Sequence, residues 1–230
     1  MNQQVLQERK VEQMVGALRI LLVVGIIAVV IGAAAMWMQG RSSAKNEKAF
    51  AMLFQAEQME QAAAREGESQ KLDPFKIMNA WVPEKKKEYE GKLQNVIKEY
   101  PDSAAAAISS LRLARFYFSA QQYKEARETY KSLIDHSSGS NLAIYKAMAW
   151  DGLASTLENE NNFEEARKAY ESGLSLKGNP LKPIAYLGQA RTFKALGKKD
   201  EAKGAYEKLM QEFPGTPYAQ RARVLLYSGL

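Results

Sequence analysis

Three stretches of the chain share one spacing of small and aromatic residues, and this repetition constrains the fold more than any single motif. In each stretch a small residue is followed twelve positions later by an alanine and four positions after that by a tyrosine. The three sets are Ala114, Ala126 and Tyr130; Ala154, Ala166 and Tyr170; and Ala190, Ala202 and Tyr206. The spacing predicts two short antiparallel helices, because the small residue allows close approach and the tyrosine fills the space beside it. The units recur after 40 and then 36 residues, close to the length of a helix-turn-helix solenoid repeat.

The middle unit carries the pattern most fully. Its matching residues are Trp150, Leu153, Ala154, Leu157, Ala166 and Tyr170. It resembles the tetratricopeptide repeat, whose consensus sets Trp, Leu, Gly, Tyr, Ala, Phe, Ala and Pro at fixed positions. The last unit adds Tyr186 at the tryptophan position and a closing Pro214. The resemblance covers residues 84–228 and implies an all-α fold, an α-solenoid of tetratricopeptide-like helical hairpins. An ordinary helical bundle is the alternative, although a bundle has no reason to keep a fixed register.

Polar triplets at equivalent places predict the turn inside each hairpin. They are Gln121-Gln122-Tyr123, Asn161-Asn162-Phe163 and Gly197-Lys198-Lys199. Upstream, the segment from Leu93 to Ser103 aligns with the segment from Tyr206 to Thr216 and predicts the second half of a further repeat.

Residues 44–66 read as a long helix that packs on the helix over 84–100 as an atypical first repeat. Its expected apolar side comprises Ala49, Phe50, Leu53, Phe54, Ala56, Met59 and Ala62–Ala64. The stretch 67–83 reads as an irregular loop with Phe75, Ile77, Met78 and Trp81. Such a loop is either tucked over the core, which we expect, or itself a contact site.

An apolar run predicts a single N-terminal transmembrane helix. Residues 20–38 (ILLVVGIIAVVIGAAAMWM) contain no charge, and as a helix they span about 28 Å, close to a hydrocarbon core of about 30 Å. Arg19 and Arg41 bracket the run, and Trp37 lies where an interfacial aromatic residue belongs. We therefore expect four parts: a short amphipathic segment (1–19), a transmembrane helix (20–40), a juxtamembrane helix with an irregular loop (41–83) and the solenoid (84–230).

A cleavable signal peptide is the rival interpretation of this run. Ala33-Ala34-Ala35 supplies a small-residue cleavage site after a 13-residue apolar core, Ile20–Gly32. Against cleavage, apolar residues continue through Met36-Trp37-Met38, and the segment before Ile20 is long for the charged region of a signal. Three basic residues lie close to the run on each side, so charge does not decide the orientation.

Small residues gather on one side of the predicted membrane helix. Gly25, Ala28, Gly32 and Ala35 fall within an arc of about 80° at 100° per residue. A face of this kind lets a second membrane helix approach closely, from another copy or another protein, although glycine and alanine are common in any membrane helix.

Composition argues against several classes of function. The net charge is +6, but residues 49–230 hold 26 basic and 23 acidic residues, so no nucleic-acid-binding surplus is expected. The chain has no cysteine and one histidine, His136, which is expected at a helix end. No phosphate-binding loop or nucleophile motif is present, and Glu164-Glu165 read as charges at a helix start. We expect no enzyme, cofactor, metal site or small-molecule substrate.

What remains is a surface for protein partners. In tetratricopeptide proteins the first helix of each repeat lines a groove that holds a partner peptide or helix, and the resemblance carries this role over by register. The main candidates are Arg115, Phe118, Asp151, Ser155, Arg191 and Lys194. The same register adds Ile108, Leu111, Met148, Glu158, Ile184 and Leu187. The lysines and asparagines with which some members clamp a C-terminal carboxylate are absent, because Leu111, Arg115, Asp151 and Ser155 occupy those positions.

The layout is similar to that of the bacterial family of the ancillary SecYEG translocon subunit. The resemblance depends on one membrane helix before the repeats and on the run from Leu111 to Phe116, LRLARF. It implies a single-pass inner-membrane adaptor with a periplasmic solenoid that meets partners or chaperones. The alternative is a soluble periplasmic protein, released after Ala35, that acts in envelope assembly or cell division. The ending FPGTP with AQRAR resembles a Tol–Pal-associated division coordinator and outer-membrane assembly factors.

Overall fold

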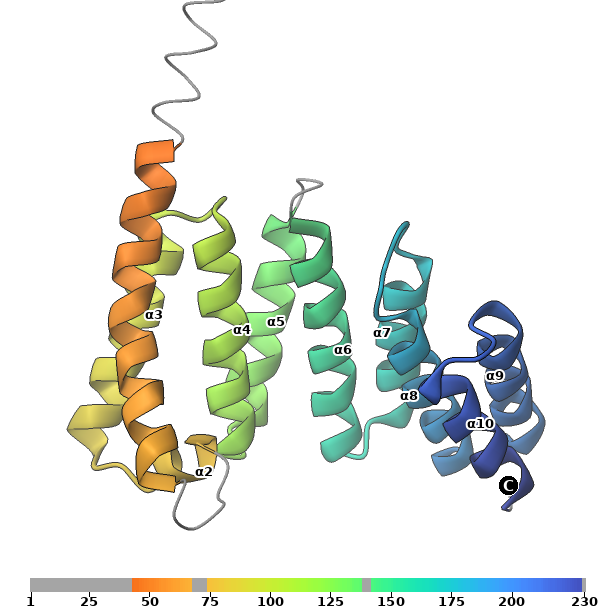
Figure 1. Ribbon diagram of the computed structural model, residues 1–230. Helices are drawn as coiled ribbons and strands as arrows, with labels where there is room; N and C mark the ends of the chain where they lie inside the picture. Colours follow the sequence, from red (N-terminus) through yellow and green to blue (C-terminus); the bar gives the residue numbers. More distant parts are fainter. Residues whose placement is uncertain (1–42, 68–73, 138–141, 229–230) are drawn as a thin grey trace, which may run out of the picture. The chain divides into compact units, whose positions relative to one another are not determined.

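The computed structural model describes residues 43–67, 74–137 and 142–228, and within these ranges the elements are α-helices without a strand (Figure 1). The chain divides into two compact units, Met1–Glu47 and Lys48–Leu230. The predicted membrane helix over 20–40, its packing face and the segment 1–19 lie outside the described residues. Among the helices that are described, none combines the length and the apolar character needed to cross a bilayer.

The second unit is a series of helical hairpins. Helix α4 (Ala104–Ser119) pairs with α5 (Tyr123–His136), α6 (Ala143–Asn159) with α7 (Phe163–Ser175), and α8 (Lys182–Ala195) with α9 (Lys199–Glu212) (Figure 1). Each second helix also packs on the first helix of the next hairpin, and the first helices α4, α6 and α8 contact one another in turn. The predicted all-α solenoid of hairpins is confirmed for the described residues.

The predicted turn triplets end the first helices through one shared backbone geometry. Gln121, Asn161 and Gly197 have φ of 61°, 59° and 73°, the left-handed conformation that ends many helices. In each turn the next residue donates its N–H to a carbonyl five positions back, over 2.9 Å, as from Gln122 to Tyr117. This bond satisfies a carbonyl at the helix end and reverses the chain direction.

The alignment of the two proline-containing segments is also confirmed. Ser103 and Thr216 follow the prolines, and their side chains accept hydrogen bonds from the N–H groups of Ala106 (3.0 Å) and Ala219 (3.2 Å). Such caps satisfy free N–H groups at a helix start. Helix α3 (Pro83–Glu99) is therefore the second helix of an earlier hairpin, and α10 (Pro217–Tyr227) is the first helix of a further one.

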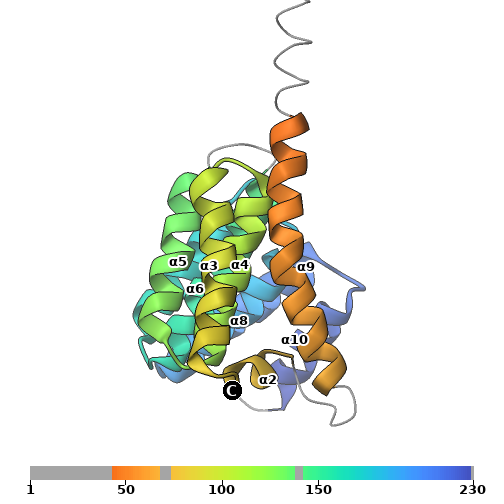
Figure 2. The ribbon, with the colours of Figure 1, turned by 90° about the vertical axis from the view of Figure 1, so that its left-hand side faces the viewer.

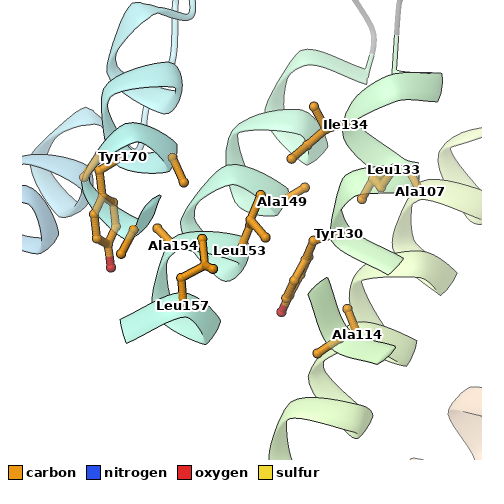
Figure 3. Close-up of a cluster of buried hydrophobic side chains, with 14 of the residues drawn as sticks. Ala107, Ala114, Tyr130, Leu133, Ile134, Ala149, Leu153, Ala154, Leu157 and Tyr170 are labelled. Carbon is orange, nitrogen blue, oxygen red and sulfur yellow. The ribbon is translucent and has the colours of Figure 1, made fainter. Parts of the chain in front are cut away.

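The repeat tyrosines pack between hairpins rather than only within them. Tyr130 and Tyr170 are buried, and each ring lies against a glycine of the next first helix, Gly152 or Gly188. A Cβ at Gly152 would lie 2.3 Å from the Tyr130 ring, and one at Gly188 would lie 2.2 Å from the Tyr170 ring. Figure 3 shows Tyr130 beside Ala149 and Leu153 of α6. The core is thus built from contacts between consecutive hairpins as well as from those within each hairpin.

Helical residues from 48 to 67, called the leading helix below, run alongside α3 and α4 (Figure 2). Ala49, Leu53, Ala56 and Ala63 are buried there, among Tyr89, Leu93, Val96 and Phe116. The predicted packing of this helix on the helix over 84–100 is confirmed.

The predicted apolar side of the leading helix is wrong for Phe50 and Phe54. These side chains are 45% and 50% exposed. At 100° per residue they lie 100° and 140° around the helix from Ala49, outside the arc that faces the core. The stretch predicted as an irregular loop contains the short helix α2 (Pro74–Asn79), and Met78 and Trp81 are buried as expected for a segment tucked over the core.

Arg112 joins the leading helix to α4. This arginine occupies the register position of Gly152 and Gly188, so the first hairpin has a cation where later hairpins have a glycine. Its guanidinium binds Glu57 over 2.7 Å and also binds Glu60, whose carboxylate accepts a hydrogen bond from Tyr89 over 2.5 Å. Burial and the neighbouring Glu60 raise the pKa of Tyr89 well above its usual value. The contacts of Arg112 with Glu57 and Glu60, called the arginine clamp below, hold the leading helix against α4.

We expect Gly188→Ala to destabilise the protein. Alanine improves helix propensity by about 1 kcal/mol, but a methyl group forced into the buried Tyr170 ring costs about 1–3 kcal/mol. The net loss should be about 0–2 kcal/mol in the free energy of unfolding, measured by urea titration. Gly204→Ala is the matched control, because a Cβ at Gly204 in α9 meets nothing within 4 Å. It should gain about 0.5–1 kcal/mol, and equal gains for both variants would contradict the prediction.

Candidate partner-binding face

A polar cluster connects three helices on the side of the first helices. Arg191 of α8 donates two hydrogen bonds to the Glu158 carboxylate of α6, from Nε over 2.9 Å and from Nη2 over 2.5 Å. Arg191 Nη2 also donates to the Tyr170 hydroxyl of α7 over 3.0 Å, and that hydroxyl donates to Glu158 over 2.9 Å. Ser155 Oγ lies 3.3 Å from the same hydroxyl. Each member therefore has at least one partner.

The carboxylate in this cluster is more buried than the guanidinium. The Glu158 side chain is 11% exposed and that of Arg191 is 59% exposed. The hydrogen bonds to Glu158 raise the pKa of Arg191 further above its usual value, and burial raises the pKa of Tyr170. A two-point contact of this kind fixes the guanidinium plane. The cluster therefore presents one oriented face of Arg191 to solvent.

Asp151 extends the row of polar groups toward the first hairpin. Burial raises the pKa of this carboxyl, Arg191 lowers it in part, and Glu158 raises it again. Burial also raises the pKa of Tyr130 to about 12, against a smaller opposing effect of Arg115. Cationic and anionic groups thus alternate along α4, α6 and α8, with Arg115 first, Asp151 and Glu158 next, and Arg191 last.

The structure brings only some of the predicted groove residues together. Asp151, Ser155 and Arg191 join the polar cluster on α6 and α8. Arg115 and Lys194 are exposed on α4 and α8. Phe118 is half-buried, with its ring 5.7 Å from that of Tyr123 across the hairpin turn, and is more a part of that turn than an exposed anchor. The binding role of these residues stays a prediction.

The repeat pattern did not predict the Tyr170 hydroxyl at this face. It treated Tyr130 and Tyr170 as core residues, because the repeat pattern places them on second helices. The ring of Tyr170 does fill the core, but its hydroxyl emerges between α6 and α8. One signal in the sequence could have indicated this. Glu158 lies twelve residues before Tyr170, at a position that the repeat register assigns to the groove, and its carboxylate can accept a hydrogen bond from the tyrosine hydroxyl.

The arrangement has the properties of a surface for another polypeptide. Oriented charges and hydroxyls lie on adjacent first helices and provide donors and acceptors at several successive points. In the ranges that the structure describes, no group of three or more His, Asp or Glu side chains could hold a metal ion. The fold and this face together define a helical-repeat scaffold.

Comparison with known proteins identifies the repeats. Residues 109–140 and 184–216 match one family profile described as tetratricopeptide repeat, and residues 147–180 match a second profile of the same description. The three matched stretches coincide with the three hairpins, each beginning within the first helix and extending past the end of the second. Repeats of this family imply a protein–protein interaction scaffold, and the fold is typical of non-enzymatic proteins.

A relative and two solved structures are similar to this chain. A "TPR repeat-containing protein" of Treponema pallidum (strain Nichols) is 26% identical over 113 residues, which cover 49% of this chain and 46% of that protein. The chain thus spans about half of that relative. TPR-like repeats of a kinesin light chain from Podosopora anserina superpose with a TM-score of 0.53, at 15% identity, over 75% of this chain and 83% of theirs. For a crystal structure of MamA the TM-score is 0.47, at 23% identity, over 61% of this chain and 76% of that chain.

We expect Asp151→Asn to stabilise the fold near neutral pH. Because the folded-state pKa of Asp151 is raised, folding favours the protonated carboxyl, and the ionised form costs stability above the unfolded-state pKa of about 3.9. The melting temperature of the variant should exceed that of the natural protein at pH 8, and the difference should shrink as the pH falls toward 4.5.

The control is Asp102→Asn, at an exposed position between Pro101 and Ser103. It should show no comparable pH-dependent gain. A melting temperature for Asp151→Asn below that of the natural protein at pH 8 would show that attraction to nearby cations outweighs burial. If the prediction holds, the chain keeps a carboxylate here against its own stability, as expected of a group kept for binding.

Proposed function

We propose that this protein is a membrane-anchored adaptor that presents a tetratricopeptide scaffold to protein partners. The observation that carries the proposal is the row of charged side chains on α4, α6 and α8. It comprises Arg115, Asp151, Glu158 and Arg191, and is called the charged row below. Glu158, Tyr170 and Arg191 form a closed hydrogen-bonded set, so their geometry exists before any partner arrives. Pre-organised groups lose less conformational entropy on binding than mobile ones.

The anchoring part of the proposal is supported by the amino-acid sequence. The uncharged run over residues 20–38 is long enough to span a bilayer, and Gly25, Ala28, Gly32 and Ala35 would give its helix a face for a second membrane helix. The layout resembles that of the ancillary SecYEG translocon subunit family. We therefore propose a single-pass protein of a bacterial inner membrane, with the scaffold on the periplasmic side and the anchor attached to a complex such as the translocon.

A photocrosslinking experiment tests whether the charged row holds a partner. A photoreactive amino acid replaces either Lys194, exposed on first helix α8, or Lys208, exposed on second helix α9. We expect a discrete adduct with a cellular protein from position 194 and none from position 208. Arg115→Glu should reduce the adduct about tenfold, because it reverses one charge of the row, whereas Lys203→Glu on α9 should not. Equal adducts from both positions, or an adduct insensitive to Arg115→Glu, would contradict the assignment of this face.

Fractionation tests the anchor and separates the two predictions for residues 20–38. We expect the chain of intact mass in the membrane pellet, resistant to extraction by carbonate and released by detergent. A soluble chain that begins at Met36 would instead support the cleaved periplasmic protein. Protease added to spheroplasts should digest the scaffold if it faces the periplasm, and a protected scaffold would reverse the proposed orientation.

A further inference from the structure

A cleft opens on the side of the second helices, between α5 and α7, with α6 as its floor. Its volume is about 380 Å³, and its floor consists of Trp150, Leu153 and Leu157. Leu153, Leu157 and Ile134 of α5, which also lines the cleft, belong to the buried cluster of Figure 3. The four residues of the charged row are not among those that line it. This hollow, called the α6 cleft below, is therefore separate from the candidate partner-binding face.

The α6 cleft lies where the middle hairpin has a smaller residue than its neighbours. Leu157 occupies the register position of Tyr117 in α4 and of Phe193 in α8. In the last hairpin the Arg167 guanidinium lies 6.0 Å from the centre of the Phe193 ring, so these two side chains pack together. A leucine does not reach as far as a phenylalanine ring, and the space beside Leu157 is open. The cleft therefore has room for one aromatic ring that the flanking hairpins supply themselves.

A cation replaces a carboxylate on the α5 wall of this cleft. In α7, Arg167 pairs with Glu171 one turn later, over 3.0 Å. In α5 the same register positions hold Arg127 and Lys131, and both line the cleft. Lys131 is exposed and forms no ion pair or hydrogen bond with another described residue. Its ammonium group is therefore available to an anionic group in the cleft.

Arg127 also has hydrogen-bonding capacity to spare. Its buried Nε lies 2.9 Å from the Glu160 carboxylate, but this N–H has no hydrogen-bond partner in the part of the chain that the structure describes. A guanidinium carries five N–H donors in a fixed fork, so one ion pair leaves donors for a second carboxylate. Together Arg127 and Lys131 carry two positive charges against the single charge of Glu160.

The carboxylates that line the cleft leave this positive end open. Glu165 of α7 is paired with Lys168 over 2.7 Å. Asp135 lies two turns after Arg127 on α5, and because α5 and α6 are antiparallel, that is the end of the cleft away from Leu157. An anionic group is therefore favoured at the end of the cleft near Leu157.

A cleft at the same register over α4 has a different chemistry. It lies between α3 and α5, has a volume of about 360 Å³ and carries Ser110 at the position of Trp150. Its α5 wall carries Glu125 and Glu128, and Tyr117 already supplies a ring. Helix α5 thus presents carboxylates to one cleft and cations to the next. An aromatic group next to an anion fits the α6 cleft and not its neighbour.

We infer that the α6 cleft is a second binding site, for a partner polypeptide that inserts an aromatic side chain next to a carboxylate. The ring fills the open space beside Leu157, over Leu153. The carboxylate of the neighbouring residue meets Arg127 and Lys131. Aromatic side chains are frequent anchors in protein interfaces, and charge complementarity selects the acidic neighbour. The site goes beyond the proposed function, because a partner can occupy it while another occupies the charged row.

Three peptides test the ligand chemistry on the full-length chain in lipid nanodiscs. They share a flexible Gly-Ser sequence and differ at two central positions, which are Phe-Glu, Ala-Glu or Phe-Lys. Fluorescence anisotropy should show the Phe-Glu peptide bound at least about tenfold more tightly than Ala-Glu and at least about threefold more tightly than Phe-Lys. Equal affinities, or no binding of any of the three, would overturn the inference. Free phenylacetate that binds as tightly as the Phe-Glu peptide would indicate a small-molecule site and would also overturn it.

Substitution of Leu157 tests where the ring binds. Leu157→Phe should supply the ring from within the chain, close the cleft and weaken the Phe-Glu peptide at least about tenfold. Tyr117 and Phe193 occupy the equivalent positions, so we expect the fold to accept an aromatic residue here. Leu187→Phe on α8 is the matched control, because Leu187 does not line the cleft, and it should leave the affinity unchanged. A folded Leu157→Phe variant that binds the peptide as the natural protein does would contradict the inference.

A charge reversal tests the site even if Leu157→Phe is unstable. Lys131→Glu changes an exposed residue and should weaken the Phe-Glu peptide at least about threefold, with the loss shrinking at high salt. Lys208→Glu, at an exposed position of α9 that does not line the cleft, is the control and should have no effect. Arg115→Glu in the charged row should also leave the affinity unchanged. Loss of binding in Arg115→Glu, or none in Lys131→Glu, would place the peptide outside the α6 cleft, and the inference would fail.

Discussion

The contact between a tyrosine of one hairpin and a glycine of the next is the interaction on which the rest of the unit depends. Tyr170 is almost fully buried, and its ring lies where a side chain at Gly188 would have to be. The same tyrosine donates its hydroxyl to Glu158 and accepts from Arg191. One residue therefore sets the spacing of α6 and α8 and positions the polar cluster between them, so the core and the candidate binding face cannot vary independently.

The first hairpin replaces this contact with a different one. Arg112 stands at the glycine position and reaches Glu57 and Glu60 of the leading helix, while Tyr89 secures Glu60 from α3. An arginine clamp suits a helix whose buried side consists mainly of alanine, since alanines bury little apolar surface and leave stability to other contacts. The result joins a helix outside the recognised repeats to the surface formed by the repeats.

The spacing of residues along the chain predicted much of this fold. It failed where the result depends on the direction of a side chain around its helix or on the length of a side chain. The hairpin turns were predictable from the three triplets at equivalent places. Asn161 and Gly197 are residue types that tolerate the left-handed conformation, whereas Gln121 adopts it although glutamine has no such preference. The exposure of Phe50 and Phe54 was not predictable, because counting apolar residues ignores their direction around the helix. The repeat pattern also treats Tyr170 as a core residue as a whole. Its ring is buried, but the side chain is long enough that the hydroxyl reaches Glu158 and Arg191 on the face of the first helices.

The sequence by itself determined the class of fold and the register of the three hairpins, because the alanine and tyrosine spacing repeats across each pair of helices. The positions that a partner would contact stay a prediction. The uncharged run of the sequence also predicts the membrane helix, which lies outside the described residues. Only the tertiary structure decided which polar groups meet. Glu158 and Arg191 are 33 residues apart in the chain and come together because Tyr170 packs against Gly188. Such distant pairs depend on the distance between helices, which no local pattern encodes.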